Sequence, residues 1–472
     1  MKILVTGTTG YIGKRLIPIL LELGHELICC VRDTNRVPQT LKNHTNVSVI
    51  EVDFLKEESL KNIPKDIDLS YYLIHSMSTS VEKFESLEKQ CALNFRKCLE
   101  HTRAKQVIYL SGIVNGNQLS KHLQSRYNVE QLLQSSKYAL TTFRAGIIVG
   151  SGSASFEIIR DLVEKLPIMI TPKWVNTKCQ PIAIRDVLSF LSKAIYRPEV
   201  MNKSYDIVGP NILSYKQMML QFARVRKLKR HILTVPVMTP KLSSYWLFFI
   251  TATSYKLATS LVDSMKVEVI GRPSDINRLL NIKPIDYKQA VKKAFMKIEQ
   301  NCIMSSWKDS LVSGRFSNRL SQYIEVPQFG CFKDIKKRTV KNETQTMKRI
   351  WAIGGHNGWY YGTILWKIRG LLDKAVGGIG LRRGRRHPSE LQTGDALDFW
   401  RVLYANNDEK RLLLFAEMRL PGEAWLEFKI INNTLMQKAT FRPKGLWGRL
   451  YWYAVLPFHG LIFNGMINKI AA

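Results

Sequence analysis

The sequence predicts an α/β fold class in which a doubly wound parallel sheet comes first and a smaller α+β domain comes last. Short apolar segments alternate with helical segments through the first 150 residues, which is the pattern of a parallel sheet with helices on both faces. Near the end of the chain, four strand patterns are joined by short turns and followed by one long helical segment. A chain of 472 residues is too long for one hydrophobic core, so several domains are expected.

Residues 1–150 supply the elements of the parallel sheet. The predicted strands are Lys2–Thr6, Glu26–Val31, Val47–Asp53, Leu69–Ile74, Gln106–Ser111 and Leu140–Arg144. The predicted helices between them are Tyr11–Leu23, Glu57–Asn62, Val81–His101 and Leu123–Ser136. In a sheet of this kind a ligand binds at the carboxyl ends of the strands. We therefore expect the binding site at that edge of this core.

Residues 151–325 are predicted to form a smaller lobe with a helical extension. Short strands alternate here with helices, of which the clearest are Phe156–Leu166, Arg185–Tyr196 and Tyr215–Arg226. We expect this lobe to hold a substrate over the first domain. Residues 242–266 give an aromatic-rich amphipathic helix that Lys256 interrupts, which favours a packed or interfacial helix over a membrane span.

A basic linker over residues 326–345 leads to an α+β domain over residues 346–472. Its predicted strands are Asp398–Tyr404, Arg411–Leu420, Ala424–Ile431 and Thr434–Phe441, and its closing helix is Leu446–Ile470. Strands that curl around a closing helix would enclose an internal cavity. We therefore expect this domain to hold a small ligand.

The closing helix has three interpretations. Nineteen uncharged residues lie between Arg449 and Lys469, close to the roughly 20 that a membrane span requires. Pro457, His459 and Asn464 interrupt this segment, and aromatic side chains gather at one end of it. We place a cavity-lining helix first, an interfacial anchor second and a membrane span last.

The formal charge of +32 predicts a negatively charged partner, such as anionic lipid or a phosphorylated ligand, with a solvated basic surface as the alternative. No nucleic-acid reading motif is visible, so nucleic acid is not expected. The seven cysteines are scattered without zinc-ligand spacing, which predicts reduced thiols and no metal site. Because the first strand begins at residue 2, we expect no signal peptide. The expected location is cytoplasmic, with a peripheral position on the inner face of the membrane as an extension.

The turn between the first strand and the first helix predicts a dinucleotide site. Gly7 permits a tight turn, Gly10 lets the backbone approach a pyrophosphate, and Gly13 lets the helix pack close to the strand. Free N–H groups and the macrodipole at the helix start favour phosphate. The predicted cofactor site also takes in the other residues of the turn, Thr9, Tyr11 and Ile12.

The end of the second strand is where such folds read the ribose. A carboxylate there would bind the 2′-hydroxyl, whereas the arginine present, Arg32, suits a 2′-phosphate. NADP(H) is therefore the preferred cofactor and NAD(H) the alternative. Asp33 follows directly, and a surface role for Arg32 is the structural alternative.

Two further strand ends add candidate cofactor contacts. Asp53 and Phe54 end the third strand and are placed to contact adenine, unless Asp53 only caps the next helix. Ile74 and His75 end the fourth strand beside the expected nicotinamide.

These motifs together resemble the extended and atypical short-chain dehydrogenase/reductases. The segments that carry the resemblance are Thr6-Gly-Thr-Thr-Gly-Tyr-Ile-Gly13, Tyr72-Leu-Ile-His75-Ser-Met, Ala92-Leu-Asn94-Phe, Tyr109-Leu-Ser111-Gly and Phe143-Arg144-Ala-Gly. More narrowly, the chain is similar to bacterial NAD(P)-binding proteins with a C-terminal domain of unknown function, through Gly150-Ser-Gly-Ser-Ala-Ser155, Gln180-Pro-Ile-Ala-Ile184 and Leu420-Pro-Gly-Glu-Ala-Trp425. The resemblance covers nearly the whole chain. It implies a Rossmann core followed by a helix-grip module of the START/polyketide-cyclase type.

The resemblance also implies catalytic residues, and here the chain departs from the family pattern. Family enzymes polarise a carbonyl with a serine, donate a proton from a tyrosine, and use a lysine four residues later. Ser111 matches the serine, but alignment on Ser125 and Glu130 puts His122 at the tyrosine and Arg126 at the lysine. Residues four apart share a helix face, and histidine can donate a proton at neutral pH. The neighbouring arginine disfavours the protonated imidazole, so this acid is handicapped.

Two functions follow from these residues. The first is an NADPH-dependent oxidoreductase that acts on an apolar carbonyl or quinone-like substrate, with Asn94 and Arg144 from the family motifs as substrate residues. The second is a redox-inert NADP(H)-binding regulator or scaffold, whose C-terminal cavity binds a lipid-like molecule at the membrane surface. The expected partners are therefore a small apolar substrate or lipid and an anionic membrane surface.

Overall fold

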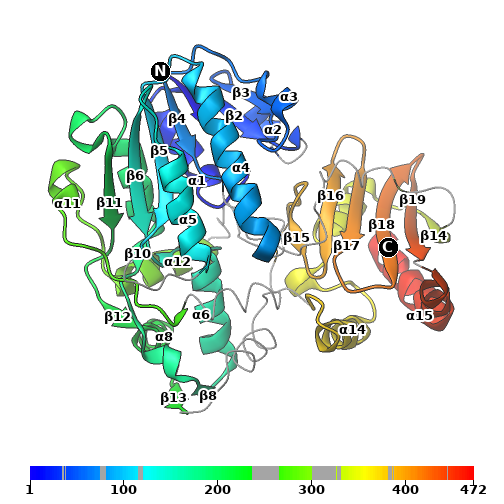
Figure 1. The fold of residues 1–472 in the computed structure, drawn as a ribbon. Helices are drawn as coiled ribbons and strands as arrows, with labels where there is room; N and C mark the ends of the chain where they lie inside the picture. The colour runs from blue at the N-terminus through cyan, green and yellow to red at the C-terminus, as the bar shows by residue number, and fades with distance from the viewer. Residues whose placement is uncertain are drawn as a thin grey trace. The chain divides into compact units, whose positions relative to one another are not determined.

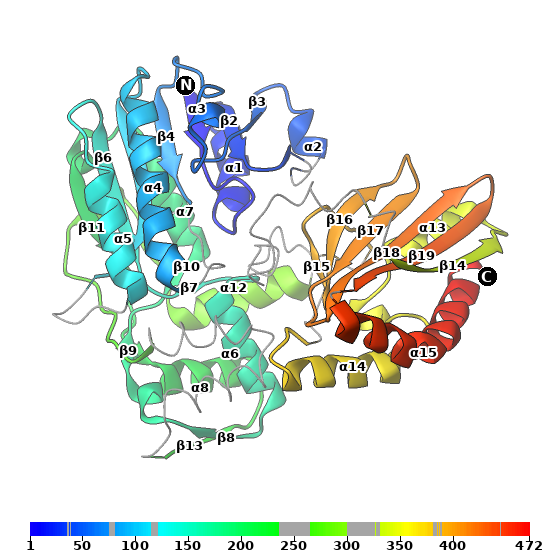
Figure 2. The same ribbon diagram turned by 45° about the vertical axis from the view of Figure 1, so that its right-hand side comes forward.

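The computed structural model of the protein describes residues 1–34, 37, 39–74, 81–114, 121–235, 265–299, 326, 331–380, 385, 387, 389–443 and 445–472. These residues fall into two compact units, the first ending at residue 299 and the second starting at residue 326. Figures 1 and 2 show both units, and each is described by itself. All but the last two residues of the helix predicted over 242–266 lie outside the described residues.

Within its described residues, the first unit contains a seven-stranded parallel sheet (Figure 1). The strands are β1 (Lys2–Val5), β2 (Glu26–Val31), β3 (Val47–Glu51), β4 (Leu69–Tyr72), β5 (Gln106–Gly112), β6 (Ala139–Ala145) and β11 (Lys203–Ile207). Their order is β11-β6-β5-β4-β1-β2-β3, and every neighbouring pair is parallel. The order reverses between β1 and β4, which is the switch point where a doubly wound sheet binds its ligand. The predicted fold class is confirmed.

Helices cover both faces of this sheet. Apolar side chains of α1 and α7 join one core, and those of α4 and α5 join the other. Alternate strand residues follow this division, since Ile3 and Val5 lie in the first core and Leu4 in the second. The helices are α1 (Gly13–Glu22), α2 (Gln39–Lys42), α3 (Glu57–Leu60), α4 (Val81–Glu100), α5 (Lys121–Leu132) and α7 (Ile184–Lys193).

The rest of the first unit consists of short strand pairs and helices. The strands are β7 (Ile148–Val149) with β10 (Ile182–Ala183), β8 (Ile168–Thr171) with β13 (His231–Thr234), and β9 (Lys178–Cys179) with β12 (Leu213–Ser214). The helices are α6 (Ala154–Lys165), α8 (Tyr215–Val225), α11 (Ile276–Leu279) and α12 (Tyr287–Glu299). Phe156, Phe222 and Phe295 join α6, α8 and α12, with ring centres 5.2 to 5.6 Å apart.

One strand of the predicted lobe belongs instead to the central sheet. β11 lies within residues 151–325, yet it pairs in parallel with β6. Its alternate residues Tyr205 and Ile207 enter the core beside α7, and this burial explains its place in the sheet.

The second unit is built on an antiparallel sheet, six-stranded in the part that the structure describes. Its order is β14-β19-β18-β17-β16-β15. The strands are β14 (Phe332–Thr339), β15 (Ala396–Leu397), β16 (Trp400–Asn406), β17 (Arg411–Ala416), β18 (Gly422–Ile431) and β19 (Thr434–Pro443). Asn432 and Asn433 close the β18–β19 hairpin at positive φ, a conformation that asparagine tolerates. β16 to β19 lie where the sequence predicts strands.

The predicted basic linker differs from the structure, because residues 332–339 form the edge strand β14 and pair with β19. Positions on the less exposed side of β14 include Asp334 and Lys336, which form an ion pair at 3.0 Å. Charges at these positions hide the apolar alternation that normally reveals a strand. Charged side chains also protect an edge strand from pairing with another chain.

Three helices share one core with this sheet, namely α13 (Glu343–Trp351), α14 (Thr363–Ala375) and α15 (Gly445–Ala471). An aromatic cluster lies between sheet and helices and consists of Trp359, Trp366, Phe399, Trp400 and Phe463. The predicted closing helix is present as α15.

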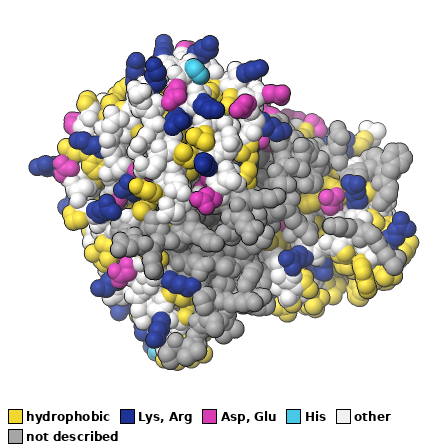
Figure 3. Space-filling model, in the orientation of Figure 1, with side chains coloured by type: hydrophobic (Ala, Val, Ile, Leu, Met, Phe, Trp, Pro, Cys, Tyr) yellow, Lys and Arg dark blue, Asp and Glu magenta, His cyan; other side chains and the backbone are white. Residues whose placement is uncertain are grey.

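In the part of the chain that the structure describes, no helix combines the length and the apolar character that a membrane crossing requires. Figure 3 shows Lys and Arg side chains spread over the visible surface of the first unit.

Candidate functional site

The three glycines of the first turn each have a steric reason. Gly7 has a φ of +66°, and an added Cβ would lie 2.4 Å from the Leu73 carbonyl oxygen. A Cβ at Gly13 would lie 2.4 Å from the Gly7 carbonyl oxygen, and one at Gly10 would lie 3.0 Å from the same atom. The Gly10 N–H donates to that oxygen at 2.8 Å. The turn is therefore as tight as the sequence predicts, and a side chain at any of the three glycine positions would collide with the backbone of the turn or of Leu73.

The start of α1 is suited to an anion. Ile12 is the N-cap residue, no side chain caps the helix, and its first turn contains no acidic residue. The macrodipole adds positive potential there, and the Lys14 and Arg15 N–H groups already donate to the Gly10 and Ile12 carbonyls, at 3.1 and 3.0 Å. Thr9 and Ile12 are half-buried beside them. The turn and helix start thus fit the diphosphate of a dinucleotide.

Tyr11 lies in the turn, but its ring packs inside the protein. The Arg15 guanidinium carbon lies 4.0 Å from the ring centre, and Arg15 also donates to the Ser151 carbonyl at 2.7 Å. A Cβ at Gly150 would lie 2.6 Å from the Tyr11 hydroxyl oxygen. Burial raises the pKa of Tyr11 to about 12. The ring therefore joins the glycine turn to the segment after β7.

Arg32 and Asp53 mark the end of the sheet where adenosine is expected. The pKa of the Cys91 thiol on α4 is raised to about 12, mainly by burial; the Asp53 charge contributes to this rise and the Arg32 charge opposes it. Both charged side chains thus lie near Cys91. Arg32 is exposed and makes no ion pair with another described residue. Asp53 accepts a hydrogen bond from the Leu55 N–H at 3.2 Å, so it also closes the turn before α3.

Phe54 and Asn94 are interior residues, which corrects their predicted roles. The Phe54 ring is buried and lies 5.7 Å from the Phe95 ring. Asn94 is 1% exposed, donates to the Phe54 carbonyl at 2.7 Å and accepts from Gln90 at 2.9 Å. Its amide is therefore committed to fixing the segment after β3 against α4, and is not available to a substrate.

Two histidines of the predicted site cannot be placed. His75 lies outside the described residues, and so does the side chain of His122, whose backbone is in the first turn of α5. Ile74 is half-buried and packs against the core beneath α4.

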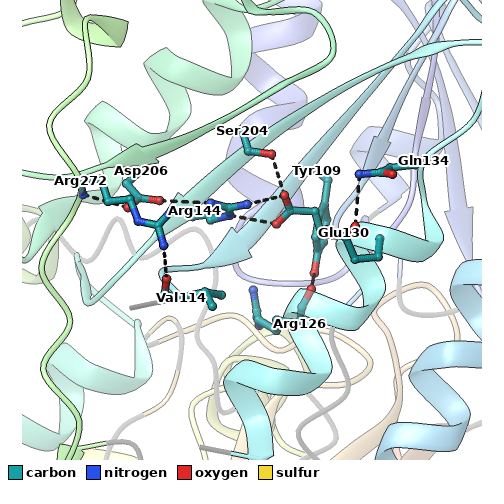
Figure 4. A network of polar contacts seen from close by, with 10 residues as sticks. Tyr109, Val114, Arg126, Glu130, Gln134, Arg144, Ser204, Asp206 and Arg272 are labelled. Atoms are coloured by element: carbon teal, nitrogen blue, oxygen red, sulfur yellow. Dashed lines mark hydrogen bonds and ion pairs between the residues drawn. The ribbon is translucent and has the colours of Figure 1, made fainter. Parts of the chain in front are cut away.

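Ser111 and Arg126 come together at the carboxyl end of β5. Ser111 is 2% exposed, and its Oγ has no hydrogen-bond partner among the described residues. Arg126 donates to the Leu110 carbonyl at 3.2 Å and accepts from the Tyr109 hydroxyl, through its own carbonyl, at 3.4 Å (Figure 4). Burial raises the pKa of Tyr109 to about 12, while the Arg126 charge and the Ser111 hydroxyl act in the opposite direction. The three side chains are therefore close neighbours.

Arg144 is part of an ion-pair network, and this corrects its predicted substrate role. Its guanidinium donates twice to Glu130, at 2.9 and 2.6 Å, and lies 3.8 Å from Asp206. Ser204 also donates to Glu130, at 2.6 Å (Figure 4). Arg144 is therefore committed to joining β6 with α5 and β11.

The same network reaches the loop after β5, through residues that sequence reasoning missed. The Arg272 N–H donates to Asp206 at 2.9 Å, and its guanidinium donates to the Val114 carbonyl at 3.4 Å (Figure 4). The sequence predicts no structural role for Glu130, which serves only to align the chain with the family motif. In the structure its carboxylate holds α5, the helix that carries Arg126, against β6 and β11.

Two family matches divide the chain as the structure does. Residues 3–140 match the NAD dependent epimerase/dehydratase family, and residues 330–466 match a family of unknown function, DUF2867.

Curated relatives match the first unit at low identity. Divinyl chlorophyllide a 8-vinyl-reductase of Arabidopsis thaliana is 22% identical over 44% of this chain and 54% of its own length. An isoflavone reductase homolog of Lupinus albus is 21% identical over 46% and 73%. Photosystem II assembly factor Ycf39 of Synechocystis is 21% identical over 44% and 63%. The chain thus spans about half the length of the plant vinyl-reductase.

Among solved structures, a nucleoside-diphosphate-sugar epimerase of Staphylococcus aureus superposes with a TM-score of 0.51 at 17% identity, over 62% of this chain and 100% of that one. An epimerase of Methanothermobacter thermautotrophicus superposes with a TM-score of 0.50 at 13% identity, over 64% and 92%. At these identities the likeness shows the fold.

Proposed function

We propose that this chain, which joins an epimerase/dehydratase-type Rossmann domain to a DUF2867 domain, is an NADP(H)-dependent oxidoreductase for an apolar carbonyl or quinone-like substrate. The family match and the reductases among the relatives support a nicotinamide cofactor. The observation that carries the proposal is the buried Ser111 hydroxyl at the end of β5, where Tyr109 is a polar neighbour and no hydrogen bond of 3.5 Å or less to a described residue engages the Oγ. Buried donors are normally paired, and a substrate oxygen at the strand end would supply the partner.

The residues around the carboxyl end of β5 have different roles in the proposed reduction. Ser111 donates a hydrogen bond to the substrate oxygen, and Arg126 adds a fixed positive charge where negative charge develops. A guanidinium is a poor proton donor in proteins, so the acid is a different residue. His122, at the family's tyrosine position, transfers the proton to the oxygen. A bound reduced nicotinamide supplies the hydride.

The preference for NADP(H) depends on Arg32. It follows β2 directly and is exposed, at the end of the sheet where adenosine is expected. A planar guanidinium binds phosphate through two parallel hydrogen bonds, so a 2′-phosphate is its best ligand.

The second candidate is a redox-inert NADP(H)-binding regulator. One observation favours it, since His122 and Arg126 stand where the family has its tyrosine and lysine. Both candidates share the nucleotide site and differ in turnover.

An assay of NADPH oxidation against apolar ketones and quinones tests the proposal. We expect turnover with one of these classes, and a loss of about 100-fold in Ser111→Ala at unchanged nucleotide affinity, because a hydrogen bond that stabilises the transition state is lost. Thr142→Val is the matched control, since it removes another buried hydroxyl without a partner, from the neighbouring strand. Tight nucleotide binding with no turnover of any substrate would favour the regulator.

A further inference from the structure

Two helices of the second unit turn large apolar side chains to solvent. Ile364, Ile368 and Leu371 on α14 are 73, 49 and 66% exposed, and Trp447, Leu450 and Leu461 on α15 are 78, 51 and 56% exposed. We call these six residues the apolar face. In Figure 3, hydrophobic side chains gather along the lower edge of this unit, over α14 and α15.

The apolar face is additional to the core. On α14, the buried residues Trp366, Gly370 and Asp373 occupy the side opposite Ile364 and Leu371, at about 100° of rotation per residue. A surface helix normally turns polar residues outward once its core side is buried. α14 therefore carries an apolar stripe that folding of this unit does not use.

α15 repeats this arrangement next to α14. Its core side includes Phe463, Met466 and Ile470, all buried. The Phe463 ring lies 6.2 Å from the Trp366 ring of α14, and the Arg369 guanidinium carbon lies 5.4 Å from the Tyr451 ring centre. The two helices are thus neighbours, and Figure 3 shows hydrophobic side chains at the surface over both.

The charges that α14 and α15 themselves expose have one sign. Lys367 and Lys374 follow one edge of the α14 stripe, and Arg449 is exposed on α15. The single acidic residue of α14, Asp373, is buried, and α15 has none. The face is therefore apolar at its centre and cationic at its edge.

We infer that the apolar face of α14 and α15 docks on an anionic lipid surface. Apolar side chains enter the acyl boundary, and basic side chains reach the anionic headgroups. Trp447 and the exposed Tyr453 have the amphipathic rings that favour this depth. A second copy of the chain fits less well, because a two-fold contact would bring Lys367 and Arg449 against like charges. The inference depends on the second unit alone and goes beyond the proposed oxidoreductase activity.

Vesicle flotation with the purified full chain tests this inference. We expect binding to phosphatidylcholine vesicles that contain about 30% phosphatidylglycerol, weaker binding to pure phosphatidylcholine, and a loss at high salt. Replacing Ile364 and Leu371 together with aspartate should lower binding at least about tenfold. Lys367→Gln should lower it about fivefold, and only in the anionic vesicles. Ile335→Asp is the control, because Ile335 is also exposed, at 47%, but lies on β14.

Three outcomes would overturn the inference. The first is that the chain does not float with anionic vesicles. The second is that the double aspartate variant floats as well as the unsubstituted chain. The third is that sedimentation velocity shows a dimer of the unsubstituted chain and a monomer of the double aspartate variant, which would assign the apolar face to a second copy of the chain. Circular dichroism of each variant separates these results from a loss of folding.

Discussion

The helices of the two units differ in what they turn to solvent. In the first unit, α7 buries Val187 and Leu191 against the sheet and exposes Arg185 and Lys193. In the second unit, α14 buries Trp366 and exposes Leu371. The first pattern is explained by folding alone. Folding alone does not explain the second pattern, and this difference is the basis for the lipid-docking inference about the second unit.

The buried charges of the two units also differ. Glu130 and Arg144 lie at the strand ends and hold α5 beside Ser111, so they support the candidate site. Arg401 and Glu417 in the second unit are completely buried, at 3.0 Å, and Arg401 also donates to the Gly394 carbonyl at 2.8 Å. This pair supports the antiparallel sheet.

The largest expected effect is the loss of that pair. Arg401→Met leaves the Glu417 carboxylate buried without its cation, which should cost about 3–5 kcal/mol in free energy of unfolding of the second unit. Urea unfolding measures the loss, and nucleotide affinity in the first unit should be unchanged. Arg401→Met combined with Glu417→Met is the control, and it should restore most of the stability. A single variant as stable as the unsubstituted chain would contradict the assigned role.

The next effect is a pH dependence confined to the second unit. Burial beside Trp452 and Phe463 lowers the pKa of His459 to about 4, the Asp334 charge opposes this, and the Arg369 and Lys336 charges add to it. The unfolded chain takes up this proton near pH 6.5, whereas the folded chain does not. Stability should therefore fall as the pH falls from 6.5 to 4, by about 3 kcal/mol in total.

Urea unfolding of the unsubstituted chain and of His459→Gln, at pH 7 and at pH 4.5, measures the contribution of His459 to the pH dependence of stability. The variant should lose less stability between the two pH values than the unsubstituted chain. Equal losses would show that His459 titrates normally in the folded state.

The smallest expected effect concerns cofactor choice in the first unit. Arg32→Ser should weaken NADPH binding at least about tenfold and leave NADH binding unchanged, because a charged hydrogen bond is worth about 1.5–3 kcal/mol. Fluorescence titration with both nucleotides measures the change. Arg278→Ser, at an arginine with a largely exposed side chain, is the control. Parallel losses for NADPH and NADH would remove the basis for the NADP preference.

The sequence predicted the first unit better than the second because its signals are local. The glycine turn and the β1–α1 transition are set by backbone sterics at Gly7 and Gly13, and these can be deduced from spacing. The place of Arg144 depends on Glu130 and Asp206, which are distant in sequence, so no local pattern reveals that its charge is already paired. Motif matching therefore placed Arg144 and Asn94 in the substrate site, and the structure places both in internal contacts.

In the second unit, β14 was missed because Asp334 and Lys336 occupy its less exposed positions. The α14 part of the apolar face was missed for a related reason, whereas an interfacial role was among the interpretations of the closing helix. Only the structure shows that Trp366, Gly370 and Asp373 of α14 are buried while Ile364 and Leu371 face solvent.

Calorimetric titration of the purified chain with NADPH and NADH tests the central claim, which is that the turn at Gly7, Gly10 and Gly13 holds a nucleotide diphosphate. We predict that both nucleotides bind and that NADPH binds more tightly. Gly13→Val, whose Cβ would lie 2.4 Å from the Gly7 carbonyl oxygen, should remain folded by circular dichroism and lose both affinities by about 100-fold. A folded chain that gives no binding heat with either nucleotide would contradict the account.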